Sequence, residues 1–104
     1  MESKQEILSS IKLQIEKVLL NARIFLFGSR ANGRFTEESD WDILVLSDEP
    51  VTLKVKQSVH NTLFSLSVLI GSFINTIIVY QKDWQQNPSY YSLRKTIASH
   101  YQAL

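Results

Sequence analysis

The sequence predicts a small α/β (α+β) domain in which helices pack on a small mixed β-sheet. Three segments carry apolar residues at helical spacing, three short apolar runs have the length of strands, and the connections between these segments are short. The predicted order is α-β-β-α-β-α, which is typical of a layered fold. A chain of 104 residues has the size of one domain, so we expect residues 1–104 to form a single unit.

The composition excludes several classes of function. Eleven basic and ten acidic side chains give a formal net charge of +1, which argues against strong nonspecific binding to nucleic acid. The chain has no cysteine, so disulfides and thiolate zinc sites are excluded. The first residues lack the apolar core of a signal peptide and no apolar run is long enough to span a bilayer, so we expect a cytoplasmic protein without membrane contact.

The first helix is predicted over residues 3–21. Ser3 and Glu6 have the spacing of a capping box before an apolar run. The apolar residues that follow recur at helical spacing, at Ile7, Ile11, Ile15, Val18 and Leu19. A buried strand is predicted next, over residues 24–27, because this short apolar run ends at a glycine.

The second strand is predicted over residues 41–46, after a polar loop. Side chains alternate along a strand, which divides this segment into two faces. One face carries Asp40, Asp42, Leu44 and Leu46, and the other carries Trp41, Ile43 and Val45. The two carboxylates therefore lie at the rim of an otherwise apolar strand, which is a usual place for an active site.

A second long helix is predicted over residues 52–69. Thr52 is a suitable residue to cap its start, and Gly71 is a plausible residue to end it. Residues 73–80 are rich in β-branched and aromatic side chains and are predicted to form the third strand.

The C-terminal region is predicted to hold a connection and one helix. Residues 81–87 form a polar connection that contains Trp84, and Pro88 separates it from a helix over residues 89–102. Its tyrosines could stack on a nucleobase, but packing of these rings in the core is the stronger expectation for Tyr90, Tyr91 and Tyr101.

A glycine turn over residues 28–34 joins the first two strands. Gly28 allows a sharp turn and a close approach of other groups. Ser29 is a good N-cap residue, and a helix beginning there would direct free N–H groups at an anion. Arg30 and Arg34 add guanidinium groups that could hold phosphate oxygens, although alone they would more often be surface charges.

Asp40 and Asp42 follow this turn closely. Their Cα atoms should lie about 6.5–7 Å apart on one face of a strand. Two carboxylates that point to one place repel each other. This repulsion raises the pKa of at least one of them unless a cation neutralises their charge. Mg²⁺ prefers such oxygen ligands, typically one or two carboxylates together with substrate phosphates. The pair alone would often be solvated edge residues, but beside the glycine turn it indicates chemistry on a nucleoside triphosphate.

Two half-motifs resemble the signature of the minimal nucleotidyltransferases of the DNA polymerase beta-like superfamily. They are Gly-Ser-Arg-Ala-x-Gly at residues 28–33 and Ser-Asp-x-Asp-Ile-x-Val-Leu at residues 39–46. The resemblance implies a Mg²⁺-dependent enzyme that transfers a nucleoside monophosphate, AMP from ATP, to a hydroxyl acceptor. It implies Asp40 and Asp42 as the catalytic, metal-holding pair. The nucleotide-binding residues that it implies are Gly28, Ser29, Arg30, Gly33, Arg34 and Ser39.

The resemblance also implies a partner. Small stand-alone members of this group are similar to the antitoxin half of a two-gene pair, whose other half is an all-helical HEPN-type protein. The implied acceptor is then a tyrosine of that partner. A homodimer of this chain is left open, as are the base of the nucleotide and the acceptor themselves.

One position departs from the family pattern. Active members carry a third acidic residue on the later strand, where this chain has Asn75 or Thr76. Neither is a carboxylate base, and general-base help is typically worth about 10²–10⁴-fold in rate. Asp83, Glu37 or Glu38 could substitute from a loop. The alternative hypothesis is therefore a catalytically weak or inactive module that binds a nucleotide or a partner protein.

Overall fold

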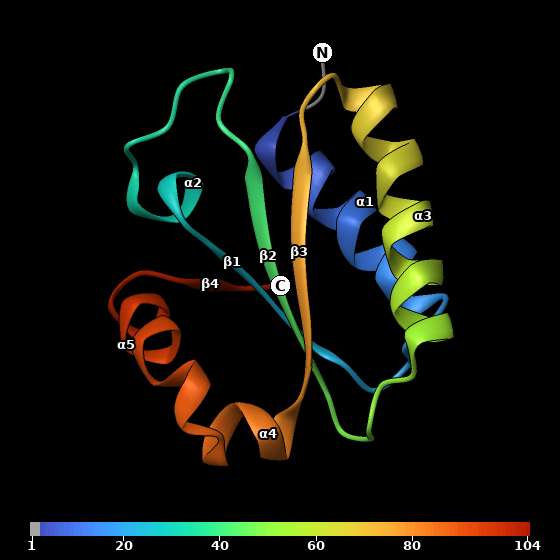
Figure 1. The fold of residues 1–104 in the computed structure, drawn as a ribbon. Helices are drawn as coiled ribbons and strands as arrows, with labels where there is room; N and C mark the ends of the chain where they lie inside the picture. Colours follow the sequence, from blue (N-terminus) through green and yellow to red (C-terminus); the bar gives the residue numbers. More distant parts are fainter. Residues whose placement is uncertain (1–2) are drawn as a thin grey trace.

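The computed structural model describes residues 3–104 and confirms the predicted layered architecture (Figure 1). The elements follow in the order α1 (Lys4–Glu16), β1 (Arg23–Phe27), α2 (Ser29–Asn32), β2 (Trp41–Ser47), α3 (Leu53–Ile70), β3 (Ile74–Tyr80), α4 (Gln81–Gln86), the 3-10 helix η1 (Pro88–Tyr90), α5 (Tyr91–Ser99) and β4 (Gln102–Ala103). The predicted order α-β-β-α-β-α is kept by α1, β1, β2, α3, β3 and α5, and the remaining elements are additions.

The strands form one mixed sheet in the order β3-β2-β1-β4. β1 pairs antiparallel with both β2 and β4, whereas β2 and β3 run parallel and are joined by the crossover helix α3. The register places Phe27 of β1 and Asn75 of β3 on either side of Asp42. The start of β2 is therefore flanked by the end of one strand and the start of another.

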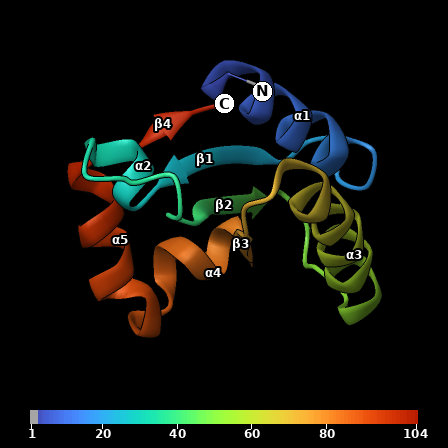
Figure 2. The ribbon, with the colours of Figure 1, turned by 90° about the horizontal axis from the view of Figure 1, so that it is seen from above.

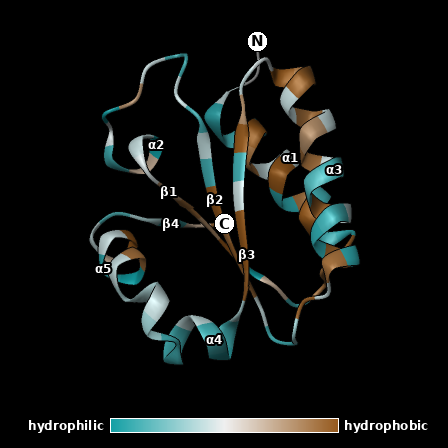
Figure 3. Ribbon diagram, in the orientation of Figure 1, coloured by the Kyte–Doolittle hydropathy of each residue, from teal (hydrophilic) through white to brown (hydrophobic). Residues whose placement is uncertain are grey.

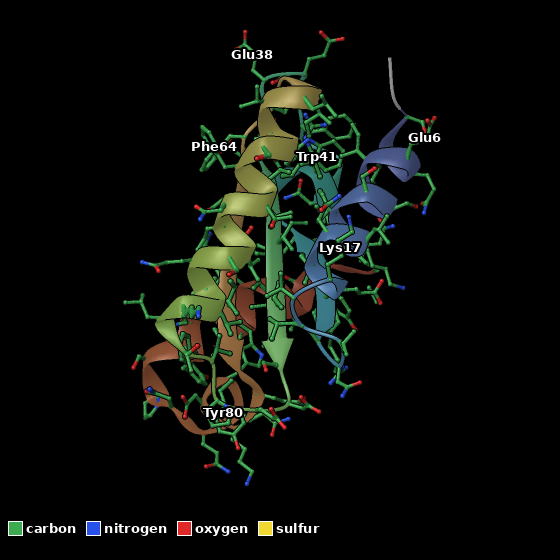
Figure 4. All side chains as sticks on the ribbon, turned by 90° about the vertical axis from the view of Figure 1, so that its right-hand side faces the viewer. Glu6, Lys17, Glu38, Trp41, Phe64 and Tyr80 are labelled. Carbon is green, nitrogen blue, oxygen red and sulfur yellow. The ribbon has the colours of Figure 1, made fainter. Side chains whose placement is uncertain are left out.

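The helices cover the two faces of the sheet differently. α1 and α3 lie over one face, and α2, α4 and α5 lie on the other (Figure 2). Hydrophobic residues are concentrated along the strands between these layers (Figure 3). The larger core cluster lies under α1 and α3, and Trp41, near the start of β2, belongs to it (Figure 4). The smaller cluster includes Leu44 and Leu46 with residues of α4 and α5, which confirms the predicted alternation along β2.

The predicted caps of the two long helices are confirmed. Ser3 accepts a hydrogen bond from the backbone N–H of Glu6, and the Glu6 side chain accepts one in return. Thr52 Oγ1 accepts a hydrogen bond of 3.2 Å from the N–H of Val55 at the start of α3. Gly71 ends α3 in the left-handed conformation, with a φ of 72°.

The predicted extent of the first helix is wrong at its C-terminal end. α1 ends at Glu16, although the apolar spacing continues to Leu19. Val18 and Leu19 still pack against the core, but from the connection that follows the helix. Apolar spacing reports which side chains face the core, and it does not require that the backbone stays helical.

The prediction for the C-terminal region is wrong in two places. Residues 81–86 form α4 rather than a loop, because Trp84 packs under the sheet while the other side chains of this helix are polar. Residues 102–103 form β4 rather than the end of a helix, and they pair with Phe25 and Leu26 of β1. Long-range pairing along the free edge of β1 thus overrides the local helical spacing.

The tyrosines of this region also differ from expectation. Tyr90 is half-buried and its ring lies 5.6 Å from that of Trp84, but Tyr91 and Tyr101 are exposed rather than packed in the core. Across residues 3–104, every helix is too short or too polar to cross a membrane.

Candidate active site

The turn after β1 and the start of β2 lie against each other. Gly28 has a φ of 73°, and a Cβ atom there would overlap Oδ2 of Asp42. Both the backbone conformation and the contact therefore require glycine. Gly28 is also the N-cap of α2, because its carbonyl accepts hydrogen bonds from Ala31 and Asn32. The expectation that Ser29 would be the cap is wrong, since Ser29 is the first residue inside this short helix.

Asp42 is the half-buried carboxylate of the site. Asn75 Nδ2 donates a hydrogen bond of 3.2 Å to its Oδ1, while Oδ2 faces Gly28. Burial raises the pKa of Asp42, the hydrogen bond from Asn75 lowers it, and the charge of Asp40 raises it further. Asp40 itself is exposed, immediately before β2. A cation beside the two carboxylates would favour their charged forms and so oppose the raised pKa of Asp42.

The position opposite Asp42 on β3 is occupied by Asn75. Asn75 and Asp42 are paired in the register of the parallel strands, whereas Thr76 is paired with Ile43 and is buried. Of the two residues considered for the missing acidic position, Asn75 is therefore the one beside the carboxylates. Asp83 lies on α4, which follows the opposite end of β3 (Figure 1). Within residues 3–104, no three His, Cys, Asp or Glu side chains are grouped to hold a metal.

Arg30 is buried and makes its contacts inside the protein. Its Nε donates to the carbonyl of Ser39 at 3.1 Å, and its Nη2 donates to the carbonyl of Glu37 at 3.3 Å. Its guanidinium carbon lies 4.0 Å from the ring centroid of Trp41 and 5.2 Å from that of Phe35. These contacts tie the loop after α2 to the start of β2 and keep that loop in place.

The electrostatics of Arg30 agree with this structural role. Burial lowers the pKa of its guanidinium, and the carboxylate of Asp40 opposes that shift. The Arg30 charge thus lies near Asp40, while its Nε and Nη2 donate to backbone carbonyls. Glu37 and Glu38 are exposed residues of the same loop.

The other predicted nucleotide-binding residues lie around the same turn. Gly33 ends α2 with a φ of 80°, and Arg34 is exposed just after it. Ser39 Oγ accepts a hydrogen bond of 2.9 Å from the N–H of Thr36, so this side chain shapes the loop. The structure brings Gly28 into contact with Asp42, places Arg34 at the surface, and turns Arg30 inward.

Sequence reasoning missed the packing around Arg30. Trp41 follows the alternation of β2 and was expected only as a core residue, yet its ring also supports the guanidinium. Lys4 of α1 donates a hydrogen bond of 3.5 Å from Nζ to the carbonyl of Arg30. These contacts join segments that are far apart in the chain, and local patterns give no signal for them.

Known proteins that are similar to this chain include nucleotidyltransferases. A family model described as a nucleotidyltransferase domain matches residues 7–96. A protein of Methanocaldococcus jannaschii, provisionally named a protein adenylyltransferase, is 39% identical over 79 residues, which cover 74% of this chain and 79% of that protein.

Solved structures show the same fold. A spectinomycin adenyltransferase from Enterococcus faecialis, with ATP and spectinomycin, matches with a TM-score of 0.68 at 25% identity, covering 81% of this chain. The chain spans only 37% of the length of that protein. A toxin-antitoxin structure with AMP-PNP matches with a TM-score of 0.61 at 18% identity, covering 98% of this chain and 72% of the other; this likeness concerns the fold alone.

Proposed function

This chain belongs to the nucleotidyltransferase domain family, and from that premise we propose that it transfers AMP from ATP to a hydroxyl acceptor. The contact between Gly28 and Asp42 carries the proposal, because it places the glycine turn directly against a carboxylate. The relatives named as adenylyltransferases, one of them in a structure with ATP, support AMP as the transferred group.

The site residues fit a magnesium ion. Asp40 and Asp42 offer hard oxygen ligands, and Mg²⁺ commonly takes one or two protein carboxylates together with substrate phosphates. The raised pKa of Asp42 fits as well, since a bound cation would favour its charged form. When bound, the ion supplies neutralisation of charge on the phosphates.

The chain's own residues would bind and orient the nucleotide. Gly28 lets the carboxylate of Asp42 approach the turn closely. The hydroxyl of Ser29 and the exposed guanidinium of Arg34 are the proposed donors to the phosphate oxygens. Arg30 would mainly keep the loop in position, because its Nε and Nη2 already donate to backbone carbonyls. In the reaction, the acceptor oxygen forms a bond to the α-phosphorus, the bond to the bridging oxygen breaks, pyrophosphate leaves, and the acceptor proton is released.

A second candidate function is nucleotide binding without turnover. It is favoured by Asn75, an amide that stands opposite Asp42, on the strand where the family resemblance implies a third acidic residue. For the acceptor, we propose a tyrosine on a helical HEPN-type partner. This choice of a protein partner follows the description of a solved structure as a toxin-antitoxin, whose likeness to this chain is one of fold.

The decisive experiment is transfer from α-labelled ATP with Mg²⁺ and a candidate partner. We expect label on the partner with the natural chain and with Asp48→Ala, an exposed control beyond the other end of β2. Asp42→Ala should lower transfer by at least about 10²-fold, as loss of a transition-state contact does. Mg²⁺-dependent ATP binding without transfer would favour the second candidate, and no ATP binding at all would contradict both.

A further inference from the structure

The sheet face that carries Asp42 also holds a pocket, formed by the sheet, α4 and α5. It encloses about 250 Å³. We call it the aromatic pocket, and its principal lining residues are Arg23, Phe25, Leu44, Trp84, Ala98 and Tyr101. In Figure 1, α4 and α5 lie on the same side of the sheet as α2, nearer to the start of β1. The turn at Gly28 and the aromatic pocket are therefore neighbouring parts of one face.

The register fixes how close they are. Leu44, which lines the pocket, follows Asp42 on the same face of β2, so their Cα atoms are about 6.5–7 Å apart. Phe25 is paired with Leu44, just as Phe27 is paired with Asp42. One pleat of the sheet thus separates the carboxylate from the floor of the pocket.

The walls of the pocket are suited to a flat ring. The rings of Phe25 and Tyr101 meet edge to face with centroids 5.7 Å apart. The guanidinium carbon of Arg23 lies 5.3 Å from the centroid of the Phe25 ring. Tyr101 is 55% exposed, so much of this aromatic side chain remains available to a ligand. Aromatic rings and planar guanidinium groups are the surfaces on which nucleobases stack.

The polar groups of the pocket agree with such a ligand. Gln81 and Gln85 contribute amides, which can donate and accept hydrogen bonds, and the lining residues include no carboxylate. Arg94 is bound to the carbonyls of Trp84 and Asn87, which ties α5 to α4 and fixes the wall. Sites for whole drug-sized ligands enclose about 300–1,000 Å³, so this pocket suits one ring system rather than an entire nucleotide.

We propose that the aromatic pocket receives the nucleobase, adenine, of the donor nucleotide while its phosphates lie at Gly28 and Asp42. This inference rests on the proposed function, because it needs the phosphates at that turn. An acceptor tyrosine fits the pocket less well, since a phenol entering hydroxyl first would carry its reactive oxygen away from Asp42. The pocket therefore selects the donor, and the acceptor approaches from the open side of the carboxylates.

The test uses separate ligands for the two parts of the face. The chain has two tryptophans, so the indole N–H signals of Trp84, in the pocket, and Trp41, in the opposite core, are distinguishable by NMR. Adenosine should shift the Trp84 signal and leave the Trp41 signal in place. Tripolyphosphate with Mg²⁺ should shift the backbone amide of Gly28 instead, and ATP with Mg²⁺ should shift both Trp84 and Gly28.

A variant that fills the pocket provides the second measurement. Ala98 is an exposed lining residue of α5, so Ala98→Phe should occupy the pocket without disturbing the core. Loss of base stacking should weaken ATP binding about tenfold or more, and should leave tripolyphosphate binding within about twofold. Lys95→Phe, on the same helix but outside the lining, is the matched control and should change neither.

The outcomes separate this inference from the proposed function. If ATP shifts Gly28 but not Trp84, or if Ala98→Phe and Lys95→Phe have the same effect on ATP, the pocket is not the base site although the proposed function stands. If ATP binding is undetectable by either signal, both proposals are overturned. Weaker ATP binding in Ala98→Phe alone, with tripolyphosphate unaffected, supports the base site.

Discussion

The two faces of β2 show how one strand serves two purposes. Ile43 and Val45 are fully buried under α1 and α3 in the larger core cluster. Asp42 and Leu44 alternate with them on the other face, where cover by α4 and α5 begins only beyond the carboxylate. The first face is dry and closed, whereas the second changes along its length from a polar site to an aromatic pocket. The alternation of side chains along a strand therefore lets neighbouring residues serve a closed core and an open face.

The difference between the faces also explains where polar groups are tolerated. A carboxylate on the closed face would be desolvated without a partner, which is costly. On the open face, Asp42 is only half-buried and receives a hydrogen bond from Asn75. The raised pKa of Asp42 records the cost that remains. The open face thus carries a carboxylate at some cost in stability.

The largest expected effect is on the closed face. Ile43→Ala removes a buried side chain from the larger cluster and should lower the free energy of unfolding by about 3–5 kcal/mol. Leu44→Ala should cost only about 2 kcal/mol, because Leu44, although buried in the smaller cluster, also borders the aromatic pocket. Urea denaturation of both variants checks this. Equal losses would mean that the two faces do not differ as described.

Gly28→Ala should cause the next largest loss in the free energy of unfolding. The left-handed backbone and the overlap with Asp42 should together cost about 2–3 kcal/mol. Gly33 has a similar φ, but an added Cβ there would meet no atom within 4 Å. Gly33→Ala should therefore cost about 1 kcal/mol. Thermal unfolding of the pair measures the difference. If Gly33→Ala is as damaging as Gly28→Ala, the contact with Asp42 adds nothing.

Arg30→Lys should have a smaller effect on stability. Lysine keeps the charge but loses the planar fork that binds the carbonyls of Glu37 and Ser39, so we expect a loss of about 1–2 kcal/mol. The exposed Arg34→Lys is the matched control and should be close to neutral. Denaturant unfolding measures both, and ATP binding separates them. A weaker ATP affinity in Arg34→Lys at unchanged stability would support its contact with phosphate.

The smallest expected effect depends on pH. The raised pKa of Asp42 means that the folded protein holds this proton more tightly than the unfolded chain, whose carboxyl pKa is near 3.8. Ionisation of Asp42 therefore opposes folding, and stability falls as pH rises through the folded pKa. Asp42→Asn should raise the free energy of unfolding at pH 7 by at most about 1 kcal/mol, after allowance for solvent screening, and by nothing at pH 3.

A comparison of unfolding midpoints at the two pH values measures this effect. Asp48→Asn, at an exposed position, serves as the control and should change little at either pH. A loss of stability in Asp42→Asn at pH 7, or an equal gain at both values, would show that the carboxylate does not carry the cost described.

The sequence alone predicts the main elements because their signals are local. The capping box at Ser3, the cap at Thr52 and the alternation along β2 each depend on neighbouring residues, and all three are confirmed. The glycine turn and the carboxylate pair were predicted to form a site in the same way, and this role stays a prediction. Their meeting was also predictable, because residues 28–42 are close in the chain and join two adjacent strands.

Only the tertiary structure decided which side chains meet across long distances. It turned Arg30 inward onto Trp41, chose Asn75 over Thr76 as the neighbour of Asp42, and paired the chain's C-terminal residues with β1 as β4. It also assembled the aromatic pocket from β1, β2, α4, α5 and Tyr101. Such contacts form because folding removes apolar surface from water wherever two segments pack together. The residue pattern of one segment does not indicate which other segment it will pack against.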